Sequence, residues 1–228
     1  MLNKVAEDIW TVDGAAVPFF GMPYTTRMTV IRLASGELWV HSPSQIDVDL
    51  MREISALGEV KYLLSPNKLH HLFLLDWINA FPQAHCYASP GLAKKRPDIQ
   101  FTKELGMRPE VEWSKEIDQT IFKGSPGMQE VVFFHRRSKT LILTDLIENF
   151  NPSAFNRWQR LLARFTGILS PNGRTPVDWR LSFLFGKKQA RQSLAVLMAW
   201  APDKIVISHG DCIWEDSVQF LKKSFSWV

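Results

Sequence analysis

The residues that could do chemistry appear first in one short stretch, "SPNKLHHLFLLDW", residues 65–77. Two adjacent histidines, His70 and His71, follow the apolar run "VKYLLS" and stand close to Lys68. Imidazole nitrogens bind transition metals, but an adjacent pair is a weak signal when it stands alone. By itself the stretch fits two interpretations, a metal site or two ordinary histidines at the start of a helix.

Other polar residues stand where apolar strands end, and a strand end can fix a side chain for chemistry. "TLILTD" ends on Asp145, and "KIVISHGD" ends with His209. "LWVHSP" ends with His41, which we expect to hydrogen-bond the adjacent loop rather than to orient a ligand. Imidazole and carboxylate are the donors that zinc, iron and manganese use. The structural alternative is that Asp145 caps a turn and His209 packs under a loop.

The surrounding sequence alternates between strands and helices that would position these ends. The strand pattern "DIWTVDG" ends in an expected turn at Asp13–Gly14, and a second turn is expected at residues 35–37 between two strands. A further strand is predicted over residues 111–118. "HHLFLLDWINAFP" has the pattern of a helix that begins at the histidine pair. Repeated strands with interspersed helices favour two sheets with helices packed outside.

From Asn151 to about Leu197 the pattern becomes helical, which we interpret as an insert in a single domain that covers residues 1–228. "SAFNRWQRLLARFTG" is predicted to be an amphipathic helix with Ser153 as its N-cap. Its aromatic stripe is expected to be core rather than a cofactor-binding face. "DWRLSFLF", further along, could form a substrate lid or the face of a homodimer.

Together these motifs resemble the metallo-β-lactamase superfamily over nearly the whole chain. A loop with histidines that opens a helix, a later strand ending in "TD" and a last strand ending in "HG" carry the resemblance. More narrowly, "NKLHHLF", "YASPGLAKKRPDI" and "SKTLILTDLIEN" look like a branch of that superfamily described as a domain of unknown function. The resemblance implies an α/β (α+β) fold, a four-layer αβ/βα sandwich of two internally similar halves.

The superfamily's first motif, His-x-His-x-Asp-His, is degenerate in this chain. If its last histidine is His71, then Pro66 and Lys68 occupy the first two histidine positions and His70 occupies the aspartate position. Proline has no donor atom, and a Lys ammonium repels a cation. The first two ligands of the motif are therefore lost.

The later motifs are partly retained. The third motif's segment is "GSPGMQE", where Met128 or Gln129 stands in place of a histidine. The fourth motif's aspartate falls on Asp145, and the fifth motif's histidine falls on His209. The resemblance thus implies that one of the superfamily's two metal positions is lost. The surviving position would be held by His70, His71, Asp145 and His209.

A single divalent metal, zinc first with iron or manganese as alternatives, would activate a water to attack an ester, thioester or phosphoester. Asp145 and Lys68 would be the catalytic residues, with Lys68 holding a substrate anion in place of the missing cation. Four protein ligands fill a zinc tetrahedron, so catalysis would then need a higher coordination number. The alternative is a catalytically inactive protein, with no cofactor or only a structural metal, that binds a ligand or a protein.

The charge and the apolar runs of the chain indicate which classes of partner to expect. The net charge is +4, and the basic residues are scattered rather than gathered into a stripe, so we expect no nucleic-acid partner. The apolar runs are shorter than the roughly 20 residues that span a bilayer, and no secretory signal is visible, so we expect a cytoplasmic protein without a membrane partner. The expected partner is a small-molecule substrate or ligand, and a homodimer stays open.

Overall fold

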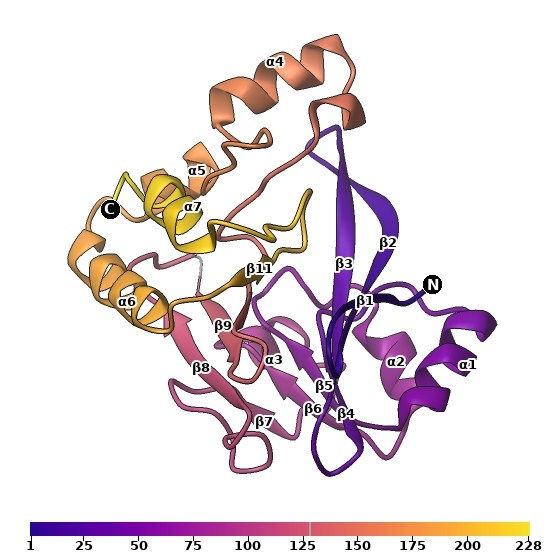
Figure 1. Cartoon of the computed structure of the whole chain (residues 1–228). Coiled ribbons are helices and arrows are strands. Elements are labelled where there is room, and N and C mark those ends of the chain that lie inside the picture. The colour runs from indigo at the N-terminus through magenta and orange to yellow at the C-terminus, as the bar shows by residue number, and fades with distance from the viewer. Residues whose placement is uncertain (128) are drawn as a thin grey trace.

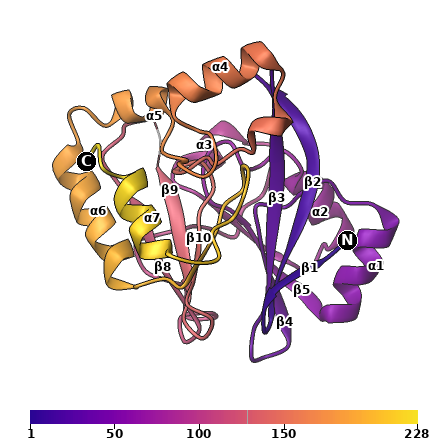
Figure 2. The same ribbon diagram turned by 45° about the horizontal axis from the view of Figure 1, so that its top comes forward.

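The computed structural model describes residues 1–127 and 129–228 and shows two β-sheets packed face to face (Figure 1). Among the described residues, the larger sheet has seven strands in sequence order, and the smaller has four in the order β11-β10-β9-β8. Helices α1 and α2 lie on one outer side and helices α6 and α7 on the other (Figure 2). This arrangement confirms the four-layer αβ/βα sandwich predicted from the sequence.

The N-terminal half supplies the seven-stranded sheet, in which β1 to β4 pair antiparallel and β4 to β7 pair parallel. Its elements are β1 (Asn3–Ala6), β2 (Ile9–Phe19), β3 (Met22–Arg32), β4 (Glu37–His41), α1 (Val48–Leu57), β5 (Glu59–Ser65), α2 (Leu74–Ala80), β6 (His85–Ala88), α3 (Leu92–Lys95) and β7 (Lys103–Glu104). The expected turn at residues 35–37 is confirmed between β3 and β4. The turn expected at Asp13–Gly14 is wrong, because both residues lie inside β2 and pair with β3.

The C-terminal half supplies the smaller sheet, in which only β10 and β11 pair parallel. Its elements are β8 (Ile117–Phe122), β9 (Glu130–His135), β10 (Thr140–Ile142), the 3-10 helix η1 (Pro152–Ala154), α4 (Arg157–Thr166), α5 (Val177–Ser182), α6 (Lys187–Ala199), β11 (Lys204–Val206) and α7 (Ser217–Ser224). The strand expected from residue 111 begins only at Ile117, after a run of turns. Of the helices in the described residues, none combines the length and the apolar character that crossing a bilayer requires.

The layers follow from the alternation of side chains along buried strands. On β5, Leu63 packs toward α1 and α2, while Tyr62 packs between the two sheets. On β9, Phe133 packs between the sheets, while Phe134 packs toward α6 and α7. Both strands therefore read as continuous apolar runs, since each is covered on both faces.

The helix predicted from the histidine pair begins later than expected. Helix α2 starts at Leu74, and the two histidines lie in the preceding loop. Asn67 causes the delay, because its Oδ1 accepts hydrogen bonds from the backbone N–H of Leu69 (2.8 Å) and of His70 (3.1 Å). An Asn side chain that binds the backbone in this way stabilises a turn at the expense of a helix.

The amphipathic helix predicted in the insert is α4, but two details of the prediction are wrong. Its N-cap is Asn156 rather than Ser153, and the cap forms a reciprocal pair of hydrogen bonds with Gln159. Ala163 is the side chain that α4 buries against the body of the protein. Of the stripe in residues 155–165, Phe155 is core as expected, but Trp158, Leu161, Leu162 and Phe165 are exposed rather than core.

Gly210, which follows β11, lies against the backbone of Asn149. Gly210 has φ 94°, and a Cβ placed on it would lie 2.2 Å from the carbonyl oxygen of Asn149. Gly36 also has a positive φ, 86°, but nothing lies within 4 Å of its Cβ position. Alanine costs about 1–2 kcal/mol in this backbone region at either site, and only Gly210 adds a clash with backbone.

We expect Gly210→Ala to lower the free energy of unfolding by about 3 kcal/mol or more. The matched control, Gly36→Ala, should lower it by only about 1 kcal/mol because its surroundings are open. Urea denaturation of both variants measures the difference. Equal losses would show that the Asn149 backbone does not restrict this turn.

Candidate metal centre

Three of the four predicted metal ligands come together where strands of both halves end. His70 follows β5, Asp145 follows β10 and His209 follows β11. His70 Nε2 lies 3.3 Å from Asp145 Oδ1 and 3.3 Å from His209 Nε2, and His209 Nε2 lies 2.9 Å from Asp145 Oδ1. Their side chains are nearly buried, with exposed fractions of 9%, 5% and 7% respectively. We call these three residues the His–Asp–His cluster.

The outer nitrogen of each ring is held by a hydrogen bond, which aims the inner nitrogen at the cluster. His209 Nδ1 lies 2.6 Å from the carbonyl oxygen of Thr25. A carbonyl only accepts, so Nδ1 carries the proton and Nε2 of the neutral ring presents a lone pair. His70 Nδ1 lies 2.6 Å from Ser42 Oγ. Metal-binding histidines are oriented in this manner in proteins.

The cluster favours positive charge between His209 and Asp145, because the Nε2 lone pair of the neutral His209 ring and a carboxylate oxygen repel at 2.9 Å. Burial alone raises the pKa of Asp145, but His70 and His209 hold that pKa well below its usual range. Burial lowers the pKa of His209, yet the hydrogen bond and the charge of Asp145 bring it above its usual value. The cluster therefore attracts either a proton or a metal cation.

The spacing and the chemistry of the donors fit a divalent metal. Zinc bonds of about 2.0–2.2 Å at tetrahedral angles separate ligand atoms by roughly 3.3–3.6 Å. The separations in the cluster, 2.9 to 3.3 Å, are close to that range. Two imidazoles and one carboxylate also suit iron and manganese.

Asn67 joins the histidine loop to the other half of the molecule. Its Nδ2 donates to Asp145 Oδ2 (2.6 Å) and to Thr144 Oγ1 (2.9 Å), while its Oδ1 holds the turn before His70. The side chain is buried. One amide therefore places the loop that carries His70 relative to the carboxylate of Asp145.

Glu130, at the start of β9, holds the loop that carries Asp145. Its Oε1 accepts the backbone N–H of Thr144 (2.7 Å), and its Oε2 accepts those of Asp145 (2.7 Å) and Leu146 (3.2 Å). Burial, followed by the charge of Asp145, raises the pKa of Glu130, and the N–H donors oppose that rise. Each carboxylate oxygen thus satisfies backbone donors that would otherwise be buried without a partner.

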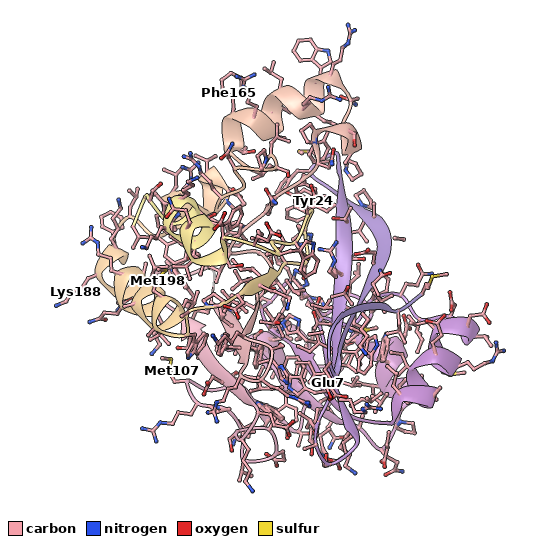
Figure 3. All side chains as sticks on the ribbon, in the orientation of Figure 1. Glu7, Tyr24, Met107, Phe165, Lys188 and Met198 are labelled. Atoms are coloured by element: carbon pink, nitrogen blue, oxygen red, sulfur yellow. The ribbon has the colours of Figure 1, made fainter. Side chains whose placement is uncertain are left out.

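A cavity of about 450 Å³ opens beside the His–Asp–His cluster. Besides the cluster, Tyr24 and Glu148 line its polar end, and Tyr24 Oη donates to Glu148 Oε2 at 3.1 Å. Figure 3 labels Tyr24 near the start of β3, within the β2–β3 hairpin. Burial raises the pKa of Glu148 to about 8. The walls are apolar and are formed by Val17, Pro18, Phe19, Pro43, Leu69, Leu72, Phe73 and Trp179.

His71 and Lys68, the other predicted site residues, lie apart from the cluster. His71 Nδ1 is 2.8 Å from Arg96 Nη1, and burial, followed by the charges of Lys95 and Arg96, lowers the pKa of His71. The Lys68 side chain lies over Gly91, where an added Cβ would be 3.1 Å from Lys68 Nζ. Neither residue is among the described residues that line the cavity. Their roles as ligand and as catalytic residue stay predictions.

His41 is buried, and its ring stacks on Trp39 with centroids 5.6 Å apart. Neither of its ring nitrogens has a hydrogen-bond partner among the described residues, so the expected bond to the loop is wrong. Burial, followed by the charge of His70, lowers the pKa of His41 to about 3. Met128, one of the residues at the lost third-motif position, lies outside the described residues.

Sequence reasoning missed the residues that support the cluster. Asn67 stands within the histidine loop, Glu130 opens an otherwise apolar strand, and Glu148 follows Asp145 by three residues. A charged residue that leads a buried strand is the signal that could have identified Glu130, because such a carboxylate needs donors nearby.

Substituting Glu130 tests its support of the Asp145 loop. In Glu130→Gln the size is kept, but one acceptor becomes an NH₂ donor, and at least one backbone N–H among residues 144–146 loses its partner. We expect the free energy of unfolding to fall by about 1–3 kcal/mol in thermal or urea denaturation. Glu59→Gln, at an exposed carboxylate, is the control and should change it by less than about 0.5 kcal/mol. Similar small effects at both positions would contradict the role of Glu130.

Comparisons with solved structures show the same fold in metallo-β-lactamases. The DIM-1 metallo-β-lactamase exposed to ceftazidime has a TM-score of 0.68 at 15% identity, over 99% of this chain and 96% of that chain. A metallo-β-lactamase from Hirschia baltica has a TM-score of 0.65 at 11% identity, over 100% and 96%. Rubredoxin oxygen:oxidoreductase from Desulfovibrio gigas has a TM-score of 0.66 at 13% identity, over 99% of this chain and 61% of that chain. At such identities the likeness shows the fold alone.

At the level of sequence, no functionally curated protein matches the chain. A family model described as a domain of unknown function, DUF4336, matches residues 6–156. The match contains His70 and Asp145, together with the supporting Asn67 and Glu130, and it ends at Asn156, the N-cap of α4. The chain therefore belongs to the DUF4336 family, a branch of the metallo-β-lactamase fold.

Proposed function

We propose that the protein is a metal-dependent hydrolase that cleaves carboxylic esters or thioesters with one divalent ion held by His70, Asp145 and His209. The observation that carries the proposal is the gathering of these donor atoms, within 3.3 Å of one another, at the polar end of an apolar cavity. Zinc is the first candidate, and iron or manganese also suit the donors. A bound ion of this kind lowers the pKa of a water and polarises a carbonyl oxygen.

A set of three ligands suits catalysis better than a set of four. Catalytic zinc sites commonly use three protein ligands and keep a position for water or substrate, whereas four ligands complete a structural tetrahedron. His71 contacts Arg96 instead of the cluster. The cluster also borders a cavity rather than packed core, so a substrate has room beside the donors.

The cavity lining favours an acyl substrate over a phosphoester. Its walls are apolar, and none of the described residues that line it is Lys or Arg. A phosphoester carries negative charge that proteins usually neutralise with Arg or Lys. An apolar acyl chain instead gains from the removal of its surface from water. The proposed substrates are therefore neutral esters or thioesters with an apolar acyl group.

Glu148 supplies the proton that the leaving group needs. Burial raises the pKa of its carboxyl, which favours the protonated acid, and Tyr24 donates a hydrogen bond to one of its oxygens from the other half of the molecule. A carboxylic acid in such a setting can protonate a departing alkoxide or thiolate. A catalytically inactive binding protein stays the alternative, but the intact donor set beside an open cavity favours the enzyme.

Metal content tests the ligand set. We expect the purified, tag-free protein to contain about one zinc, iron or manganese per chain by elemental analysis. His70→Ala, His209→Ala and Asp145→Asn should each lose most of that metal, because each removes one of three ligands. His71→Ala is the matched control and should retain it. If His71→Ala loses metal as fully as His70→Ala does, the three-ligand set is wrong.

Hydrolysis assays test the substrate class. We expect turnover of esters and thioesters to rise with the length of an apolar acyl chain, and little turnover of phosphoesters. Trp179→Ala removes part of the cavity wall and should raise KM for a long-chain ester by about tenfold, with a smaller effect on kcat. Trp214→Ala, at an exposed tryptophan outside this cavity, is the control. A metal-loaded protein that cleaves only phosphoesters would overturn the assignment.

A further inference from the structure

Helix α4 presents an apolar face to solvent. Trp158, Leu161, Leu162 and Phe165 are 77%, 44%, 57% and 77% exposed. Their spacing places them on one side of the helix, and in a globular protein such a face normally packs against the core. In this chain α4 packs instead through Ala163, on the opposite side. Figure 1 shows α4 at the far end of the molecule, beyond the β2–β3 hairpin.

The tip of the β2–β3 hairpin extends this face. Phe20, at the tip, is 89% exposed. Gln159 Nε2 donates to the carbonyl oxygen of Gly21 at 2.8 Å, which fixes the hairpin tip against α4. The apolar rim, as we name this surface, consists of Phe20, Trp158, Leu161, Leu162 and Phe165.

The charged side chains in the chain segment that contains α4 are all basic. Residues 149–177 contain four arginines and no aspartate or glutamate, in a chain whose net charge is +4. Three of these arginines, Arg157, Arg160 and Arg164, lie on α4 itself and are exposed. None of the four takes part in an ion pair among the described residues. The side chains therefore keep their positive charge available for a partner.

We propose that the apolar rim docks on the surface of an anionic lipid bilayer, with α4 lying in the plane of the interface. Helices that place Trp, Phe and Leu on one face and Arg beside it bind at the headgroup boundary. Anionic headgroups attract each basic residue near the surface. A second copy of the chain fits the surface less well, because it would bring the arginines of two α4 helices together, and α4 itself contains no acidic residue to balance them.

Docking would place the cavity mouth near the bilayer. Phe19 lines the cavity, and the next residue, Phe20, belongs to the apolar rim. Apolar esters that partition into lipid would then reach the cavity from the membrane, a consequence that rests on the proposed function. The docking itself does not rest on it. The sequence predicted no membrane partner because its apolar runs are too short to span, and a surface helix does not span.

Vesicle co-sedimentation of the full chain tests the docking. We expect binding to vesicles of equal parts phosphatidylcholine and phosphatidylglycerol, and at least tenfold weaker binding to phosphatidylcholine alone or at high salt. Brominated acyl chains should quench part of the tryptophan fluorescence of the wild type, and Trp158→Phe should lose that part. Neither readout depends on hydrolysis or on metal, so failure of the proposed function leaves this test intact.

Matched variants locate the binding surface. The triple variant Trp158→Ser, Leu162→Ser, Phe165→Ser should bind anionic vesicles at least tenfold more weakly, because it removes most of the apolar face. Met107→Ser with Val111→Ser changes exposed apolar residues elsewhere and should bind as the wild type does. Figure 3 shows Met107 well apart from Phe165. Circular dichroism and thermal melting check that each variant is folded.

Three outcomes would overturn the proposal. The first is no binding of the folded wild type to anionic vesicles at low salt. The second is equal binding by the wild type and the triple variant. The third is a stable dimer in light scattering that the triple variant abolishes while vesicles do not compete with it, which would assign the apolar rim to self-association.

Discussion

The buried carboxylate of Asp145 is the constraint on which the rest of the site depends. A carboxylate moved from water into a protein interior costs several kcal/mol unless charge and hydrogen bonds compensate it. Asp145 is 4% exposed, and its partners come from both halves of the fold: Asn67 and His70 from the first, His209 from the second. The two sheets must therefore meet with their strand ends in register for the carboxylate to be satisfied.

Glu130 is a second buried carboxylate, farther from the cluster, that also depends on hydrogen bonds. It is fully buried, and its oxygens collect the backbone N–H groups of the loop that carries Asp145. Two carboxylates buried so close together raise the electrostatic cost of the apo state, which a cation at the His–Asp–His cluster would reduce.

The sequence predicted the fold and the residues of the cluster because strand ends and the superfamily motifs carry that information. It placed His71 with His70 because a motif gives the spacing of residues along the chain but not the direction in which each side chain points. The turn that Asn67 makes sends adjacent side chains to different partners, His70 to Asp145 and His71 to Arg96. The hydrogen bonds of Asn67 to Glu130 and Asp145 could not be identified from the sequence, since these partners are 63 and 78 residues away.

Helix α4 shows a different limit of periodicity. The spacing of its apolar residues identified one face, but that spacing does not show whether the core or a partner covers the face. Such a face can be covered by the core or by a partner, and here α4 buries Ala163 and leaves the apolar side exposed. Keeping four large apolar side chains in water forgoes roughly 1.5–3 kcal/mol for each that could be buried. The buried charge of Asp145 and the exposed apolar rim both depart from the usual partition of residues. Asp145 lines the cavity, and Phe20 of the rim directly follows Phe19, which lines it too.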